Sequence, residues 1–180
     1  MKNILISALM LLSGAFAQST FTVTSPSLTE GGTLPLDQVF NDWGCPGKNI
    51  SPELSWSGTP EGTKSFAVTA YDPDAPTGSG WWHWLVFNIP AETNTLPAGA
   101  GGAQKDLLPK GAVQSLTDFG QPGYGGACPP AGAPHRYVFT VFALKTSNLG
   151  LGENTMPATV GFNLNSNALA KASITVTYGR

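Results

Sequence analysis

The chain has 180 residues and a net charge of −2 at neutral pH, and charged residues make up only 11% of it. This balance excludes the dense basic surface that nucleic-acid-binding domains use. The length suits one domain, and 22 glycines with 15 prolines predict many tight turns between short strands.

The first 17 residues are typical of a secretory signal peptide. Lys2 gives the positive start, residues 4–12 are largely apolar, and residues 15–17 (AFA) form a small-x-small cleavage site. The apolar run is too short to anchor the chain in a bilayer, and no later segment is long and apolar enough to span one. We expect cleavage after Ala17, one mature domain over residues 18–180, and a periplasmic or secreted protein.

Most of the remaining chain predicts β-strands. The segments are residues 21–25, 65–71 (SFAVTAY), 82–89 (WHWLVFNI), 136–144 (RYVFTVFAL) and 173–178 (SITVTY). Residues 65–71 alternate larger apolar side chains with smaller ones. Residues 82–89 and 136–144 are apolar on both faces, which is typical of central strands covered on both sides. The pattern therefore predicts a mostly β fold, either two packed sheets or a sheet with a cover.

Between these strands the sequence predicts loops and one helix. Residues 97–103 and 120–134 are rich in glycine and proline and should be loops. Residues 157–171 begin with a proline suited to a first helical turn and place Val160, Leu164 and Ala168 on one face. We expect a helix over this range.

Cys45 and Cys128 are the only cysteines. Export to an oxidising compartment favours a disulfide between them. Their spacing fits no zinc site, and two thiols alone rarely hold a metal.

The stretch "DPDAPTGSGWWHW" at residues 72–84 is the first candidate for chemistry. Prolines hold Asp72 and Asp74 in an extended, stiff conformation directly after a strand. Strand alternation then places His83 on one face with Trp81, Leu85 and Phe87, while Trp82 and Trp84 point the other way. A buried imidazole needs a hydrogen-bond partner, and Asp72 across the hairpin is the candidate.

The second histidine has a similar setting, because His135 follows the glycine- and proline-rich loop and shares a face with Tyr137 at the start of a strand. If the two rings meet, protonated imidazoles and backbone N–H groups suit an anion such as phosphate. Binding should then weaken as the histidines lose protons at higher pH. Spacing alone leaves the plainer interpretation open, in which histidines and tryptophans are packed core residues and the acidic motif is a rigid turn.

A hydrolase is the alternative. An Asp–His pair can act as a general base, with Ser79 or Tyr137 as nucleophile or acid, although no G-x-S-x-G elbow is present. His83, His135 and Asp72 also have the ligand types of a zinc set.

Three motifs carry a resemblance to a known family. They are "NISPELSW" (49–56), "YDPDAPTGSGWWHWLVFNIP" (71–90) and "GYGGACPPAGAPHRYVFTVFAL" (123–144). Together they resemble the phosphatidylethanolamine-binding protein family, also called the Raf kinase inhibitor-like family, and most of all its bacterial exported branch. The resemblance implies two packed antiparallel sheets, a helix near the C-terminus, and a small anion pocket at one end of the central sheet.

The resemblance also implies a set of site residues and partners. The ligand-binding residues would be Asp72, Asp74, Pro76, Trp81, His83, Ala127, Cys128, Pro129, Pro130, His135 and Tyr137. A Cys45–Cys128 bridge would make the pocket wall rigid, and the long C-terminal helix of animal members has no counterpart after Tyr178. We expect no metal or other cofactor, a small anion such as phosphate or phosphoethanolamine as ligand, a kinase or protease as protein target, and a homodimer through an edge strand.

Overall fold

The structure is a computed structural model that describes residues 20–102 and 105–180. The predicted signal peptide lies outside the described residues. Within the part of the chain that is described, no helix has the length and apolar character to cross a membrane.

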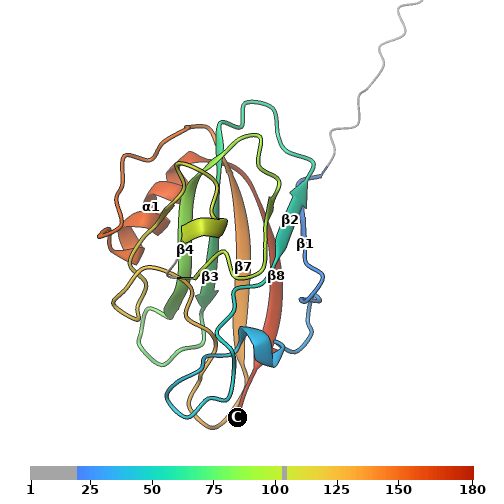
Figure 1. The fold of residues 1–180 in the computed structure, drawn as a ribbon, viewed down its shortest axis with the longest axis vertical. Coiled ribbons are helices and arrows are strands. Elements are labelled where there is room, and N and C mark those ends of the chain that lie inside the picture. The colour runs from blue at the N-terminus through green and yellow to red at the C-terminus, as the bar shows by residue number, and fades with distance from the viewer. Residues whose placement is uncertain (1–19, 103–104) are drawn as a thin grey trace, which may run out of the picture.

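A five-stranded antiparallel sheet forms the centre of the molecule (Figure 1), with the strand order β6-β4-β3-β7-β8. Its strands are β3 (Ser65–Asp72), β4 (Trp81–Pro90), β6 (Val113–Gln114), β7 (His135–Leu144) and β8 (Ala168–Tyr178). The two apolar runs predicted as central strands are β4 and β7, which lie on either side of β3 in the middle of this sheet. Their continuous apolar character is explained by cover on both faces.

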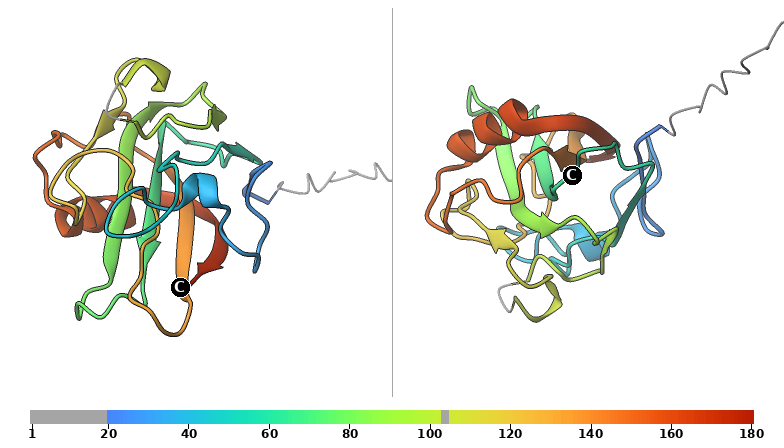
Figure 2. Two further views of the ribbon diagram at one scale, coloured as in Figure 1. Left: turned by 60° about the horizontal axis from the view of Figure 1, so that its bottom comes forward. Right: turned by 90° about the horizontal axis from the view of Figure 1, so that it is seen from above.

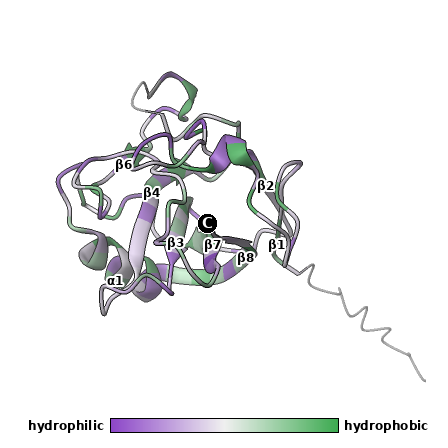
Figure 3. Ribbon diagram, turned by 90° about the horizontal axis from the view of Figure 1, so that it is seen from below, coloured by the Kyte–Doolittle hydropathy of each residue, from purple (hydrophilic) through white to green (hydrophobic). Residues whose placement is uncertain are grey.

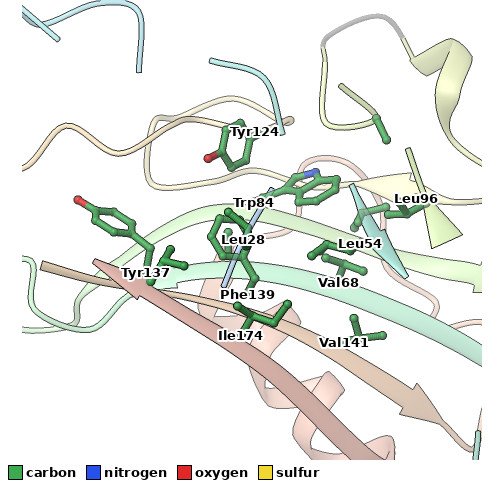
Figure 4. Close-up of a cluster of buried hydrophobic side chains, with 14 of the residues drawn as sticks. Leu28, Leu54, Val68, Trp84, Leu96, Tyr124, Tyr137, Phe139, Val141 and Ile174 are labelled. Carbon is green, nitrogen blue, oxygen red and sulfur yellow. The ribbon is translucent and has the colours of Figure 1, made fainter. Parts of the chain in front are cut away.

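A smaller three-stranded sheet covers one face. It consists of β1 (Thr22–Thr24), β2 (Leu54–Ser57) and β5 (Thr95–Leu96) in the order β1-β2-β5, all antiparallel. The main core lies between the two sheets, where Leu54 and Leu96 meet Val68, Trp84 and Phe139 (Figure 4). Two 3₁₀ turns, η1 (Leu36–Gln38) and η2 (Lys105–Leu107), lie in the connecting segments.

Helix α1 (Pro157–Asn167) covers the opposite face (Figures 1 and 2). Val160 and Leu164 are buried in a second apolar cluster with Leu85 and Phe87 of β4. Gly161 allows the helix to approach the sheet closely, because a Cβ at this position would lie 3.3 Å from the Trp82 ring. The predicted fold class, two antiparallel sheets with one helix near the C-terminus, is confirmed.

The predicted end of the helix is wrong. The helix stops at Asn167, and residues 168–171 belong to β8, which pairs with β7 along its whole length from Ala168 opposite Leu144 to Tyr178 opposite His135. Side chains from Ala168 onward alternate between partly buried and exposed, which is the period of a strand. Pairing along β7 satisfies more of its backbone groups than one further helical turn would, and this tertiary gain overrides the local helix preference.

Candidate ligand-binding pocket

A cavity of about 340 Å³ lies at the end of the central sheet where β3 ends and β4 and β7 begin. These strand ends lie beside the C-terminus, at the end of the molecule seen in Figure 3. From the strands, the lining includes Asp72, Trp81, His83, His135 and Tyr137, all of them predicted site residues. Pro76, Cys128, Pro129 and Pro130 line it from loops and were also predicted.

Asp72 and His135 form a buried pair across neighbouring strands. His135 donates from Nδ1 to Asp72 Oδ2 at 2.8 Å, and the two side chains are 13% and 4% exposed. The other carboxylate oxygen accepts the backbone N–H groups of Asp74 and Ala75 at 2.8 and 3.1 Å. The proline-stiffened turn therefore holds the Asp72 carboxylate in place, and that carboxylate in turn orients the His135 ring.

Asp74 and Ala127 were predicted site residues but are not part of the cavity lining. Asp74 forms a two-pronged pair with Arg136, at 2.7 Å to Nη2 and 2.9 Å to Nε, and it also accepts the Arg136 backbone N–H. These hydrogen bonds to Arg136 lower the pKa of Asp74 to about 2. Ala127 is buried and pairs its backbone with Val39 behind the pocket loop.

His83 reaches the cavity through a β-bulge. Ala70 pairs with Trp84 and Tyr71 pairs with Trp82, so His83 is an extra residue on β4 without an opposite partner on β3. One extra residue breaks the alternation of a strand. His83 and Trp84 both face the side of the smaller sheet, whereas Leu85 and Phe87 face the helix. The prediction that His83 shares a face with Leu85 and Phe87, opposite Trp84, is therefore wrong.

The partner of His83 also differs from the prediction. Its Nδ1 lies 2.6 Å from the carbonyl oxygen of Gly125, and Asp72 is bonded to His135 instead. Burial lowers the pKa of His83 to about 4, against smaller opposing effects of the Gly125 carbonyl and the Asp72 charge. His83 is thus uncharged at neutral pH, so the expectation of two protonated imidazole donors is wrong for this ring.

Two adjacent glycines let the loop approach His83. The Gly125 N–H donates to the His83 carbonyl at 2.9 Å, and Asn49 Oδ1 accepts the Gly126 N–H at 2.6 Å. A Cβ on Gly125 would lie 2.4 Å from the Phe119 ring, and one on Gly126 would lie 2.4 Å from the Phe40 nitrogen. The segment "GYGG" therefore needs both glycines for close packing, and Asn49 of "NISPELSW" fixes it in place.

Two of the residues that line the cavity have a buried hydrogen-bond donor without a partner. Among the described residues, neither the Tyr137 hydroxyl nor the Trp81 indole N–H has a hydrogen-bond partner, and both residues line the cavity. Figure 4 shows the Tyr137 hydroxyl directed away from the aliphatic core. Burial raises the pKa of this phenol well above its usual value, so it stays protonated. Buried donors without an acceptor are costly in free energy, and these two belong to residues of the cavity wall, whereas Gln38, Trp56 and Ser115, which also have an unpartnered buried group, do not line it.

The second wall was largely missed from the sequence. Trp43 and Phe119 stack with their ring centroids 5.2 Å apart, and Phe119 also meets the edges of Trp81 and His83. Arg180 donates from Nε to the Pro129 carbonyl at 2.7 Å and from Nη1 to the Trp43 carbonyl at 3.2 Å. No local pattern marks these residues, because only tertiary contacts bring them to the cavity.

The disulfide between Cys45 and Cys128 is present in the structure and joins this wall to the pocket loop. Cys128 lines the cavity, and Cys45 belongs to the tight turn after Asp42. The bridge therefore fixes the segment that carries Trp43 against the segment that carries Pro129 and Pro130.

The residues named for the hydrolase alternative are assembled only in part, because Asp72, His135 and Tyr137 line the cavity but Ser79 does not. Ser79 is exposed in the turn before β4 and does not line the cavity. Within residues 20–102 and 105–180, no three His, Cys, Asp or Glu side chains are grouped so that they could hold a metal ion. The zinc set of His83, His135 and Asp72 therefore does not form in this structure.

The two packed sheets, with a cavity lined by polar and aromatic side chains at the end of the central sheet, are typical of a small binding protein. The chain belongs to the phosphatidylethanolamine-binding protein family, whose profile matches residues 24–179. It is 52% identical to the UPF0098 protein YbcL of Escherichia coli K12 over 180 residues, which cover 99% of this chain and 98% of the relative. It is 53% identical to YbhB of the same organism over 154 residues, covering 86% and 97%.

Solved structures support the same assignment. The crystal structure of E. coli YbcL, described as a new member of the mammalian PEBP family, superposes with a TM-score of 0.88 at 55% identity and covers 91% of this chain and 99% of that chain. A homologue from Chlamydia trachomatis, CT736, gives a TM-score of 0.73 at 30% identity, covering 89% and 97%.

Proposed function

We propose that this protein is an exported binding module whose cavity captures a small anionic group, phosphate-like or carboxylate. The carrying observation is that two residues lining a cavity of head-group size, Tyr137 and Trp81, each have a buried donor without a partner, the Tyr137 hydroxyl and the Trp81 indole N–H. Oxygen acceptors of an anion would satisfy both donors, and hydrogen bonds to charged acceptors are stronger than those to neutral ones.

The charges around the cavity support an anion. Arg180 brings a permanent positive charge to one wall. Among the described residues that line the cavity, only Asp72 has a carboxylate side chain, and its oxygens are engaged by His135 and by two backbone N–H groups. A carboxylate whose lone pairs are used by hydrogen bonds within the protein repels an incoming anion less than a bare one does.

The ligand-binding residues are therefore proposed in two groups. Tyr137, Trp81, His83 and His135 would face the anion, while Asp72 orients His135. Pro76, Cys128, Pro129 and Pro130 would shape the walls. Asp74 would act through the turn that positions Asp72, and Ala127 through the backbone of the pocket loop.

The volume limits how much of a ligand is enclosed. Drug-sized ligands occupy cavities of roughly 300 to 1,000 Å³, so this cavity is at the small end of the range. It suits a head group such as phosphate or phosphoethanolamine, with the rest of the molecule outside.

Export and a protein partner belong to the same proposal. A signal peptide over residues 1–17 would deliver the single domain of residues 18–180 to an oxidising compartment, where the Cys45–Cys128 bridge is stable. There the module would act by occupying a partner, such as a kinase or protease, through an anionic group presented to the cavity.

Calorimetry with inorganic phosphate and acetate tests the proposal. We expect saturable binding to the wild-type protein and roughly tenfold weaker binding to Tyr137→Phe, which removes one hydroxyl donor. Tyr71→Phe is the matched control, because the Tyr71 hydroxyl donates to the Ser79 carbonyl outside the cavity and its loss should leave the affinity unchanged. The absence of any anion binding to the folded wild-type protein would refute the proposal.

A further inference from the structure

The His83 ring has a fixed tautomer. Its Nδ1 lies 2.6 Å from the Gly125 carbonyl oxygen, and a carbonyl oxygen only accepts hydrogen bonds. Nδ1 must therefore carry a hydrogen. Because His83 lines the cavity and Nδ1 is engaged by the backbone, Nε2 is the ring nitrogen that remains to meet a ligand.

The surroundings of the ring keep it neutral. His83 is only 5% exposed, and the rings of Phe119 and Tyr137 meet it at centroid distances of 5.4 and 5.2 Å. Burial is the main reason that its pKa falls to about 4. Hydrogen bonding to the Gly125 and Gly126 backbone and the Asp72 charge on β3 oppose this shift, and the His135 charge on β7 adds to it. At neutral pH, Nε2 therefore presents a lone pair and accepts a hydrogen bond.

The residues that line the cavity thus supply both hydrogen-bond donors and a hydrogen-bond acceptor. Trp81 Nε1–H only donates, and the Tyr137 hydroxyl is an unpaired buried donor. His83 Nε2 requires a donor in return. A matching ligand carries oxygen acceptors for Trp81 and Tyr137 and one hydrogen on the atom that faces His83.

We infer that the cavity selects a protonated phosphate group, either hydrogen phosphate or the monoanion of a phosphomonoester, over anions of the same shape that carry no hydrogen, such as sulfate and phosphodiesters. This inference rests on the proposed anion-binding function and specifies the chemistry of its ligand. Phosphate keeps one O–H at neutral pH, whereas sulfate has none. An oxygen of sulfate would place its lone pairs against the lone pair of His83 Nε2.

Comparison of phosphate and sulfate isolates this one hydrogen. At about pH 8, both are tetrahedral dianions, because the second phosphate pKa is about 6 to 7, so shape and charge are matched. Leaving Nε2 without a donor, against a lone pair, should make sulfate roughly 10- to 100-fold weaker than phosphate. Below about pH 4, His83 becomes protonated and donates from both nitrogens, so phosphate, which is then a monoanion, should lose its preference over the sulfate dianion.

Calorimetric titration of the full-length mature protein with each anion, at about pH 8 and then at stepwise lower pH, measures this ratio. Far-UV and near-UV circular dichroism at each pH verify that the protein is folded. Tyr137→Phe is the internal control: it removes a donor that serves both anions, so it should weaken both and leave the ratio between them unchanged.

Organic phosphates extend the test. Ethyl phosphate should bind well below its second pKa of about 6 and lose affinity above it, whereas diethyl phosphate should bind poorly at every pH. Phosphatidylcholine vesicles containing either phosphatidic acid or phosphatidylethanolamine then distinguish a lipid source from a soluble one. Binding to phosphatidic acid vesicles alone indicates a lipid monoester, and binding of ethyl phosphate without any vesicle binding indicates a soluble monoester.

The outcomes separate this inference from the function on which it rests. Phosphate and sulfate that bind with equal affinity at about pH 8 would overturn the inference and leave the anion pocket intact. Preferential binding of diethyl phosphate, or of phosphatidylethanolamine vesicles over phosphatidic acid vesicles, would also overturn it. Failure of every anion to bind would remove both the inference and the proposed function.

Discussion

The two walls of the cavity are built in different ways. The wall formed by β3, β4 and β7 carries the polar groups, with Asp72, His83, His135 and Tyr137 on the ends of hydrogen-bonded strands. The facing wall is formed by loops and is mainly aromatic and apolar, with Trp43 and Phe119 stacked on each other beside the prolines that follow Cys128.

The strand wall therefore positions the polar side chains, and the loop wall encloses the cavity. Strand ends are held by the sheet on both sides, so their side chains can be placed accurately without further support. Loops lack that support, and here a disulfide and the hydrogen bonds of Arg180 to two loop carbonyls supply it. Perturbing the loop wall should therefore change enclosure and global stability, whereas perturbing the strand wall should change the chemistry of binding.

The largest expected effect comes from removing the disulfide. The bridge closes a loop with a sequence separation of 83, and the chain-entropy model gives a stabilisation of roughly 4 to 5 kcal/mol for a loop of this size. The Cys45→Ser, Cys128→Ser double variant should lose about that amount in urea unfolding. Alkylation before and after reduction should show both thiols of the wild-type protein masked, and free thiols in unreduced protein would contradict the bridge.

On the strand wall, Asp72→Ala should be the most damaging substitution. It leaves His135 and the backbone N–H groups of Asp74 and Ala75 without their acceptor, and breaking a buried pair costs about 3 to 5 kcal/mol. Urea unfolding measures the loss, and titration with phosphate should show weak or absent binding in whatever fraction stays folded.

Two variants sharpen the Asp72 result. Asp72→Asn keeps an acceptor for the backbone and should recover part of the stability. Asp74→Ala, two residues along the same motif, breaks an exposed pair with Arg136 and should cost only about 1 kcal/mol or less. An equal loss for Asp72→Ala and Asp74→Ala would show that burial of the first pair is not the cause.

The contrast between the walls also explains what the sequence could predict. Strands β3, β4 and β7 were predicted to within one residue at each end because their apolar runs are long and continuous. Strands β2, β5 and β6 were missed, since segments of two to four residues such as Val113–Gln114 are too short to show a period. They form because neighbouring strands supply backbone hydrogen-bond partners for them.

The same logic applies to the cavity. Polar residues at the ends of strong strands, such as Asp72 and His135, could be predicted, and their meeting follows from the adjacency of β3 and β7. The direction of His83 could not, because a bulge depends on the pairing of two strands and leaves no trace in local alternation. Trp43 and Arg180 could not be predicted either, since neither belongs to a motif and both reach the cavity only through tertiary contacts.

The next effect concerns the pH dependence of stability. The folded-state pKa of His83 is lowered from 6.5 to about 4, so the unfolded ring takes up a proton first as the pH falls. The contribution of the neutral ring is complete above pH 6.5 and is lost between 6.5 and about 4. At 1.36 kcal/mol per pKa unit, the free energy of unfolding should fall by up to about 3 kcal/mol across this window.

Urea unfolding at stepwise pH measures this slope, with His83→Gln as the comparison. Glutamine keeps an N–H donor for the Gly125 carbonyl and does not titrate, so its curve should lack the loss between pH 6.5 and about 4. The Asp74 carboxylate does not interfere, because its pKa is lowered from 3.8 to about 2 and its contribution is lost only at lower pH. Parallel slopes in the two proteins would show that His83 is not the titrating group.

The smallest effect on stability should come from Trp43→Ala on the loop wall. The side chain is 55% exposed, and its ring contacts with Phe40 and Phe119 should contribute about 1 kcal/mol or less to folding. Its side chain has no hydrogen-bonding role in the cavity, so inorganic phosphate should bind within about twofold of wild type. Phenyl phosphate, whose ring would stack on this wall, should lose affinity by roughly 2- to 10-fold, because an aromatic pair contributes about 0.5 to 1.5 kcal/mol. If the affinities of both ligands fall equally, the loop wall does not bind the attached group separately from the anion. Trp43 would then act by holding the Arg180 contacts in place.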